Sequence, residues 1–152
     1  MNTTKQYGEK ADLALSMWVK LARAFSTFNR LTGKDIASYG LTQPQFGLLE
    51  TLGHLGPMKI GDFCGKMLVS GGNVTVVVDN LEREGYVERV RDSDDRRTIT
   101  VRLTEKGTKL FNDTFKKHAA FVAEISSVLT SDEQRELSKL LRKLGTALQE
   151  KV

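Results

Sequence analysis

Apolar residues near the N-terminus recur at helical spacing along residues 11–32. This spacing predicts a helix, and its two adjacent apolar stripes are wider than one core requires. Burial on two sides, within the subunit and against another copy, accounts for the width; a central helix in a monomer is the alternative. The stripes consist of Leu13, Met17, Leu21, Ala24, Phe28 and Leu31, and of Leu15, Trp18, Ala22 and Phe25.

Local capping signals predict a second helix beginning after Thr42. Thr42 is followed three residues later by Gln45, which is the spacing of a capping box. Leu41 and Phe46 have the spacing of a hydrophobic staple across the same helix start. A glycine-proline pair at residues 56–57 is expected to end the helix.

A short third helix is predicted over residues 58–68, before a break at Ser70 and its two following glycines. The apolar side of this segment carries Ile60, Phe63, Cys64, Met67 and Leu68.

Residues 73–85 support two opposing predictions. The valines and Thr75 favour a strand by intrinsic propensity. Read as a helix, however, four apolar residues share one face and Gly85 takes the C-terminal cap position. The helix accounts for more residues, and its β-branched side chains cost roughly 1–2 kcal/mol in total, which packing overrides. The four residues on the shared face are Val74, Val77, Val78 and Leu81.

Two strands are predicted at residues 86–90 and 98–103, the second by alternation of apolar and polar residues. The residues between them, 91–97, form a polar hairpin tip. Long amphipathic helices follow, one capped by Thr104 and one beginning at a second capping box after Thr130. The chain therefore begins and ends with long amphipathic helices.

This order of elements predicts a mainly α protein with a small β-hairpin wing. The expected architecture is a winged helix-turn-helix at residues 42–103, flanked by N- and C-terminal dimerisation helices at residues 8–35 and 105–150. All belong to a single predicted domain, residues 1–152. The major groove of double-stranded DNA admits one helix, and a wing can insert arginine into the minor groove.

Composition narrows the function classes further. The net charge of +4 permits an anionic partner without identifying one. No apolar run can span a bilayer and the polar start lacks a signal-peptide core, so a cytoplasmic protein without membrane contact is expected. The single cysteine, Cys64, excludes internal disulfides and multi-cysteine metal sites. No catalytic motif occurs at a recognisable spacing, so neither enzymatic activity, a cofactor nor a metal is expected.

Three segments resemble the MarR family of bacterial transcriptional regulators, in the order and at the spacing of that family. They are Leu41–Phe46, Val78–Arg89, and Asp95–Arg97 followed by Val101–Gly107. The resemblance covers nearly the whole chain. It implies a homodimer whose terminal helices intertwine and whose two winged helices bind a pseudo-palindromic operator. Many members of the family are repressors released by small aromatic or phenolic anions, and some are released by thiol oxidation.

DNA contacts are predicted at the recognition helix, which is the helix predicted over residues 73–85, and at the wing tip, residues 91–97. Asn73 is expected to hydrogen-bond adenine or a phosphate, while Val76 either meets a thymine methyl or packs under the wing. Arg96 is expected to enter the minor groove, with Asp95 orienting the wing and Arg97 on phosphate; a solvated tip is the alternative. The full predicted set is Ser70, Gly72, Asn73, Thr75, Val76, Asn80, Asp95, Arg96 and Arg97.

The start of the recognition helix departs from the common family pattern at Gly71, Gly72 and Asn73, so no operator sequence is carried over. Charges of both signs surround the predicted DNA face. Each of the arginines among them is individually expected to lie on solvated surface, with a phosphate contact as the alternative. They are Arg83, Arg89, Arg91 and Arg102, interspersed with Glu82, Glu84, Glu88 and Asp92.

The resemblance also implies an effector pocket where the first, second and fifth helices meet. Trp18, Phe25, Phe46 and Leu49 are candidate walls for a small aromatic ligand, although each is also explained as core. Cys64 is a candidate redox sensor, with a buried structural cysteine as the alternative. The expected function is transcriptional repression; the alternatives are a thiol-sensing repressor and a winged helix that contacts protein or RNA.

Overall fold

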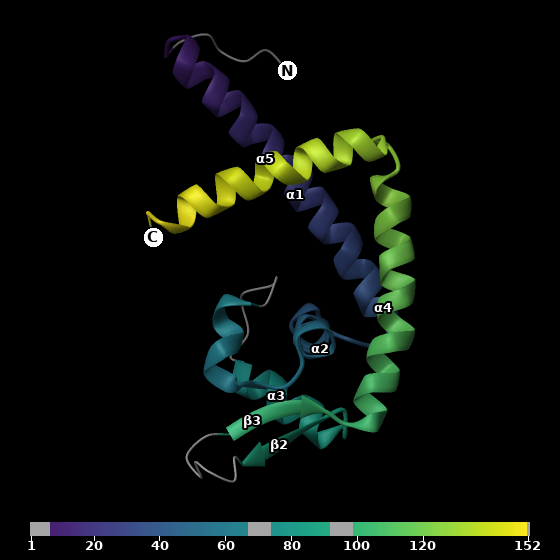
Figure 1. Cartoon of the computed structure of the whole chain (residues 1–152). Helices are drawn as coiled ribbons and strands as arrows, with labels where there is room; N and C mark the ends of the chain where they lie inside the picture. The colour runs from purple at the N-terminus through teal and green to yellow at the C-terminus, as the bar shows by residue number, and fades with distance from the viewer. Residues whose placement is uncertain (1–6, 67–73, 92–98, 152) are drawn as a thin grey trace. The chain divides into compact units, whose positions relative to one another are not determined.

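The computed structural model describes residues 7–66, 74–91 and 99–151 (Figure 1). These residues form a mainly α structure with a small antiparallel sheet, and this winged helix-turn-helix confirms the predicted fold class. The chain divides into two compact units, one up to Phe115 and the other from Lys116. The elements are α1 (Glu9–Ser38), α2 (Gln43–Leu55), β1 (Met58–Lys59), the 3₁₀-helix η1 (Ile60–Gly65), α3 (Val74–Arg83), β2 (Val87–Arg91), β3 (Ile99–Leu103), α4 (Glu105–Ser126) and α5 (Ser131–Gln149).

Both predicted capping boxes are present. The backbone N–H of Gln45 donates to Thr42 Oγ1 at 3.3 Å, and Thr42 N–H donates to Gln45 Oε1 at 2.9 Å. Thr130 and Glu133 make the same pair of hydrogen bonds at the start of α5. Hydrogen bonds from Thr130 also lower the pKa of the Glu133 carboxyl. These starts are recognisable in the sequence because every group involved lies within one helical turn.

The predicted helix over residues 58–68 is wrong at its start and in its type, and residues 67–68 lie outside the described residues. Met58 and Lys59 form the strand β1, which pairs antiparallel with Val101 and Thr100 of β3, and η1 follows directly. Among the described residues the sheet therefore has three strands in the order β1-β3-β2, in place of the predicted two-stranded hairpin. Short apolar runs do not distinguish a helix from a strand, and the partner of β1 lies far along the chain.

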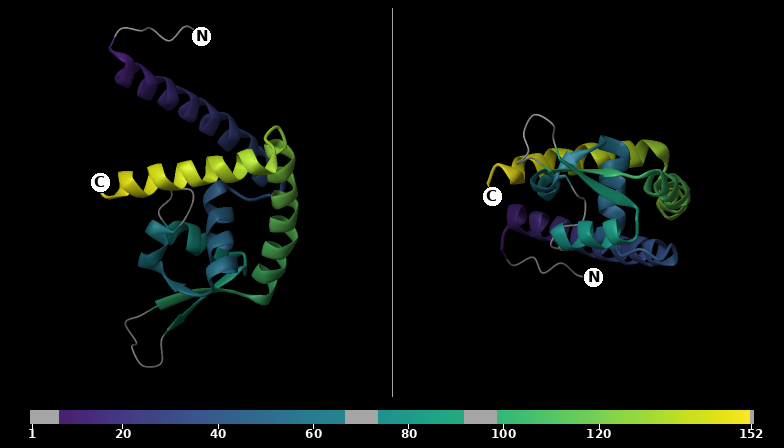
Figure 2. Two further views of the ribbon diagram at one scale, coloured as in Figure 1. Left: turned by 45° about the horizontal axis from the view of Figure 1, so that its top comes forward. Right: turned by 90° about the horizontal axis from the view of Figure 1, so that it is seen from below.

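One apolar core joins α2, η1, α3 and the sheet, and α1 reaches it through Ile36 near its C-terminal end. Figure 2 shows α3 and the adjacent β2-β3 pair from two further sides. This core holds α3 and the sheet in one unit. Its buried members are Ile36, Leu41, Phe46, Leu48, Leu49, Leu52, Met58, Phe63, Val77, Val78, Leu81, Val87 and Val101.

The α1–α2 connection contains a tyrosine whose ionisation is coupled to folding. Tyr39 packs against the core, and its hydroxyl donates to Asp35 Oδ1 at 2.8 Å. Burial, together with the hydrogen bond and charge of Asp35, raises the pKa of Tyr39 to about 12, from an ordinary value of 10.0.

The free energy of unfolding is therefore expected to contain a contribution from Tyr39 that is complete below pH 10.0 and is lost as the pH rises to about 12. The reason is that the folded chain retains the phenolic proton over this interval while the unfolded chain releases it. Denaturant titrations across the interval, for the parent and for Tyr39→Phe, measure the contribution. Parallel declines for the two proteins would contradict it.

Candidate nucleic-acid interface

The segment whose valines favour a strand by propensity, but whose apolar spacing predicts a helix, is the helix α3. Val78 and Leu81 are fully buried, Val77 is buried beside them, and Val74 packs against the same core. The opposite side carries Val76 at its centre, with Asp79 and Arg83 nearby, and all three are exposed. Burial of the inward face thus outweighs the weak helix propensity of the valines and leaves an outward face free for a partner.

The end of α3 is set by Gly85. This glycine has a φ of 78°, and its N–H donates to the carbonyl of Glu82. The next N–H, from Tyr86, reaches back to the carbonyl of Leu81 at 2.9 Å. Together these bonds form a Schellman motif, which ends the helix and directs the chain into β2.

Arg89 of β2 ties the recognition helix to the sheet. Its guanidinium pairs with Asp79 at 2.5 Å and also with Glu82, and its backbone N–H donates to Glu82 Oε1 at 3.0 Å. Burial lowers the pKa of Arg89, but the hydrogen bonds to Asp79 and Glu82 outweigh this and raise it overall. The arginine therefore pairs with two carboxylates of α3 and offsets one of their two negative charges.

The expectation that Arg89 lies on solvated surface is thus wrong. Only 22% of the Arg89 side chain is exposed, because strand alternation points it to the same face as buried Val87. A signal was available in the sequence: Asp79 and Glu82 lie three residues apart, on one side of the predicted helix. Because Arg89 lies further along the chain, in a strand, helical spacing did not identify it as the partner of these two carboxylates.

The start of α4 is hydrogen-bonded to the backbone that follows α3. Thr104 Oγ1 donates to the carbonyls of Gly85 and Tyr86 and accepts from Gly107 N–H at 3.0 Å. Lys106 Nζ donates to the Glu84 carbonyl at 2.6 Å and lies 4.4 Å from the centroid of the Tyr86 ring. The segment resembling the family at residues 101–107 is therefore a structural joint between α4 and the end of α3.

The predicted DNA contacts fall into two groups. Ser70, Gly72 and Asn73, and the wing-tip residues Asp95, Arg96 and Arg97, lie outside the described residues. Of the others, Thr75 and Val76 are exposed on α3, and Asn80 is partly buried with its side-chain oxygen accepting from Arg83 at 2.6 Å. At 50% exposure Val76 is not buried among the described residues, contrary to the alternative that it packs under the wing.

The four candidate walls of the effector pocket have different surroundings. Phe46 and Leu49 are buried in the core, whereas Trp18 and Phe25 are 60% and 68% exposed on α1. The Phe46 ring lies 6.5 Å from that of Phe115, in a ring cluster where α2 meets the first part of α4. The effector pocket itself remains a prediction.

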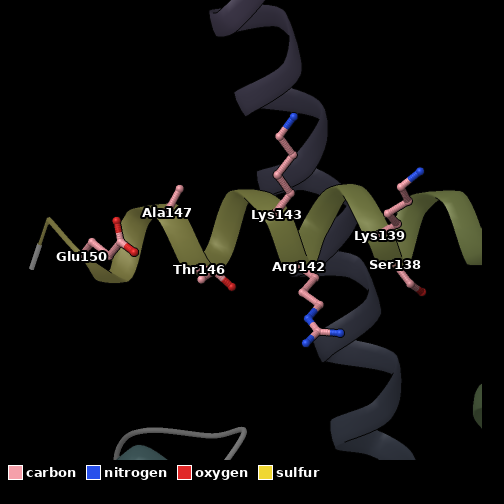
Figure 3. Close-up of a pocket in the computed structure, with 7 residues that line it drawn as sticks. All are labelled: Ser138, Lys139, Arg142, Lys143, Thr146, Ala147 and Glu150. Atoms are coloured by element: carbon pink, nitrogen blue, oxygen red, sulfur yellow. The ribbon is translucent and has the colours of Figure 1, made fainter.

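A shallow hollow lies on α5, and Figure 3 shows that its lining side chains project from one helix in different directions. Because a single helix supplies the whole lining and its side chains do not converge, this surface does not resemble an enclosed ligand site. The lining consists of Ser138, Lys139, Arg142, Lys143, Thr146, Ala147 and Glu150.

Other kinds of site find no support in the part of the chain that the structure describes. Its histidine, cysteine and acidic residues form no group of three or more that could hold a metal ion. No described helix combines the length and apolar character needed to cross a membrane. Cys64 belongs to η1, but its side chain is outside the described set, so its redox role remains a prediction.

The sequence model of the MarR family matches residues 41–99. The HTH-type transcriptional regulator MhqR of Bacillus subtilis (strain 168) is 35% identical over 132 residues, covering 87% of this chain and 91% of the relative. The HTH-type transcriptional regulator YkoM of the same organism is 34% identical over 137 residues, covering 90% and 89%.

Two solved structures share the fold. A cysteine-to-serine mutant of MarR from E. coli, complexed with operator DNA, has a TM-score of 0.75 at 22% identity and covers 90% of this chain and 99% of that one. The organohalide-sensing regulator RdhR-CbdbA1625, bound to 2,4-dichlorophenol, has a TM-score of 0.75 at 20% identity, covering 97% and 89%. With the helix α3 and its wing, these relationships establish that the chain belongs to the MarR family, as a DNA-binding transcriptional regulator with a winged helix-turn-helix.

Proposed function

We propose that the protein is a homodimeric repressor that binds a pseudo-palindromic operator and is released by a small phenolic ligand. The observation that carries the dimer is the apolar surface of α1, where Leu13, Trp18 and Phe25 are mostly exposed. Large exposed apolar surfaces on soluble proteins mark sites of association. A second copy offers the same surface, so one two-fold interface would cover the apolar α1 surfaces of the two copies.

The last helix supports the same proposal independently. None of the residues of α5 is buried, although its leucines follow a heptad pattern typical of helix pairing. Burying the exposed half of each leucine against a partner contributes about 0.7–1.5 kcal/mol. The exposed leucines are Leu137, Leu140, Leu141 and Leu148.

Dimerisation would allow regulation without direct competition for DNA. The α3 helices of the two subunits would enter successive major grooves, about 34 Å apart along one face of the duplex. A ligand that binds better to dimers with another spacing would lower operator affinity by shifting the population. The phenolic ligand class is supported by the 2,4-dichlorophenol bound to RdhR-CbdbA1625.

Sedimentation equilibrium and fluorescence anisotropy test the proposal together. We expect the mass of two chains, and we expect tighter binding to the native upstream region than to random duplex at each of several salt concentrations. Adding 2,4-dichlorophenol should weaken binding to the upstream duplex. A monomer, or equal affinity for both duplexes, would refute the operator-binding dimer; insensitivity to the phenol would refute only the ligand class. Adding peroxide instead of the phenol tests the thiol alternative, which requires loss of DNA binding in the parent but not in Cys64→Ser.

Arg96→Ala is expected to weaken operator binding roughly tenfold for each half-site, and so about a hundredfold for the dimer, through the loss of one charge-assisted contact in the minor groove per half-site. The dimer mass should not change, since the wing tip is remote in sequence from the proposed dimerisation helices. Anisotropy measures the first quantity and sedimentation the second. Equal operator affinity in parent and variant would remove Arg96 from the proposed contact.

A further inference from the structure

Val76 is a residue that the fold itself does not explain. Its side chain is 50% exposed on α3, while the adjacent Val77 and Val78 are buried. It belongs neither to the described core cluster nor to the partly buried apolar residues packed against that cluster. At an exposed helical position valine is a weaker helix former than alanine, so packing and propensity give no reason for it.

The polar neighbours of Val76 on the outward face are engaged within the chain. Asp79, one turn further along, is paired with Arg89. The side-chain oxygen of Asn80 accepts a hydrogen bond from Arg83. The methyl groups of Val76 thus provide an apolar contact at the centre of a helix face whose nearby polar groups are held in place.

We propose that Val76 contacts the C5-methyl group of a thymine and thereby selects a T·A pair at one position in each half-site. In the major groove the thymine methyl is the apolar feature of the base edges, and an aliphatic side chain is complementary to it. The inference rests on the proposed binding of an operator by α3. It deepens that proposal by assigning the chemistry that Val76 recognises.

The experiment replaces each thymine of the operator duplex, one position at a time, by deoxyuridine. This change removes the methyl group and keeps the base pair and its hydrogen-bonding edge. Parent, Val76→Ala and Val128→Ala are compared by anisotropy; Val128 is an exposed valine in the turn between α4 and α5, outside the DNA-binding lobe. Val76→Thr keeps the β-branched shape but replaces one methyl by a hydroxyl, so it separates shape from apolar contact.

At one position per half-site, deoxyuridine should weaken binding of the parent and of Val128→Ala about fourfold, and about fifteenfold when both half-sites are changed, as expected for one buried methyl each. Val76→Ala should bind the thymine duplex more weakly and show no further loss with deoxyuridine. Val76→Thr, which retains one methyl group, should keep part of this sensitivity.

Equal sensitivity to deoxyuridine in the parent and Val76→Ala at every position would overturn the inference, as would a parent that is insensitive throughout. In both cases the operator would still be bound and the proposed function would stand. A parent with no preference for any duplex would instead overturn the operator proposal, and the inference with it.

Discussion

Replacing Gly107 with alanine is expected to lower the free energy of unfolding by about 3 kcal/mol, an effect at the upper end for overpacking. A Cβ at this position would lie 1.8 Å from the backbone oxygen of Tyr86. That oxygen accepts from Thr104 N–H at 3.1 Å, so the clash cannot be relieved by a side-chain rotation. The start of α4 would have to move away from the end of α3. Denaturant unfolding followed by circular dichroism measures the loss.

Gly145→Ala is the matched control, because Gly145 also lies within a helix but has no atoms near the position of an added Cβ. There the substitution should raise the free energy of unfolding by about 0.5–1 kcal/mol, through helix propensity alone. The same chemical change is thus expected to have opposite signs at the two sites. Stabilisation by Gly107→Ala would contradict the prediction, because it would show that the start of α4 moves away from the Tyr86 backbone at little cost.

Arg89→Ala is expected to destabilise the protein by about 2 kcal/mol and to weaken operator binding further. The substitution removes hydrogen bonds to two carboxylates and the packing of a largely buried aliphatic stem. It also leaves Asp79 and Glu82 without their neutralising cation on the helix proposed to face the phosphates. Denaturant unfolding measures the first effect, and anisotropy under folded conditions measures the second.

Two further variants separate these effects. Arg102→Ala breaks the Arg102–Glu88 pair across β2 and β3, which is about half exposed, so it should cost no more than about 1 kcal/mol. Adding Asp79→Asn to Arg89→Ala should recover part of the operator affinity, because it removes an unpaired negative charge. If Arg89→Ala and Arg102→Ala gave equally small losses of stability, Arg89 would be an ordinary surface ion pair.

The elements that sequence patterns placed well are those defined by neighbours in the chain. The start of α2 depends on Thr42 and Gln45, and the end of α3 depends on Gly85; the groups that bond there lie within a few residues of each other. Predicting that α3 is a helix required the spacing of its apolar residues, since propensity alone favoured a strand. The helix was predictable because Val77, Val78 and Leu81 share one helical face, and the core buries all three.

The features missed by sequence reasoning depend on partners that are distant along the chain. Met58 and Lys59 become a strand because β3 offers them free backbone groups, which no local pattern reveals. Arg89 becomes a link between α3 and the sheet because folding brings Asp79 and Glu82 to its guanidinium. Isolated charges and short apolar runs are ambiguous until their neighbours in space are known.

The sequence alone thus determined the long helices, the helix caps and the inward face of α3, because these depend on periodicity and on bonds within one turn. Only the tertiary structure decided that Val76 is exposed, that Arg89 pairs with two carboxylates of α3, and that Gly107 must lack a side chain beside the Tyr86 carbonyl. Burial, ion pairing and close backbone approach are relations between segments, and they come into existence only when the chain packs.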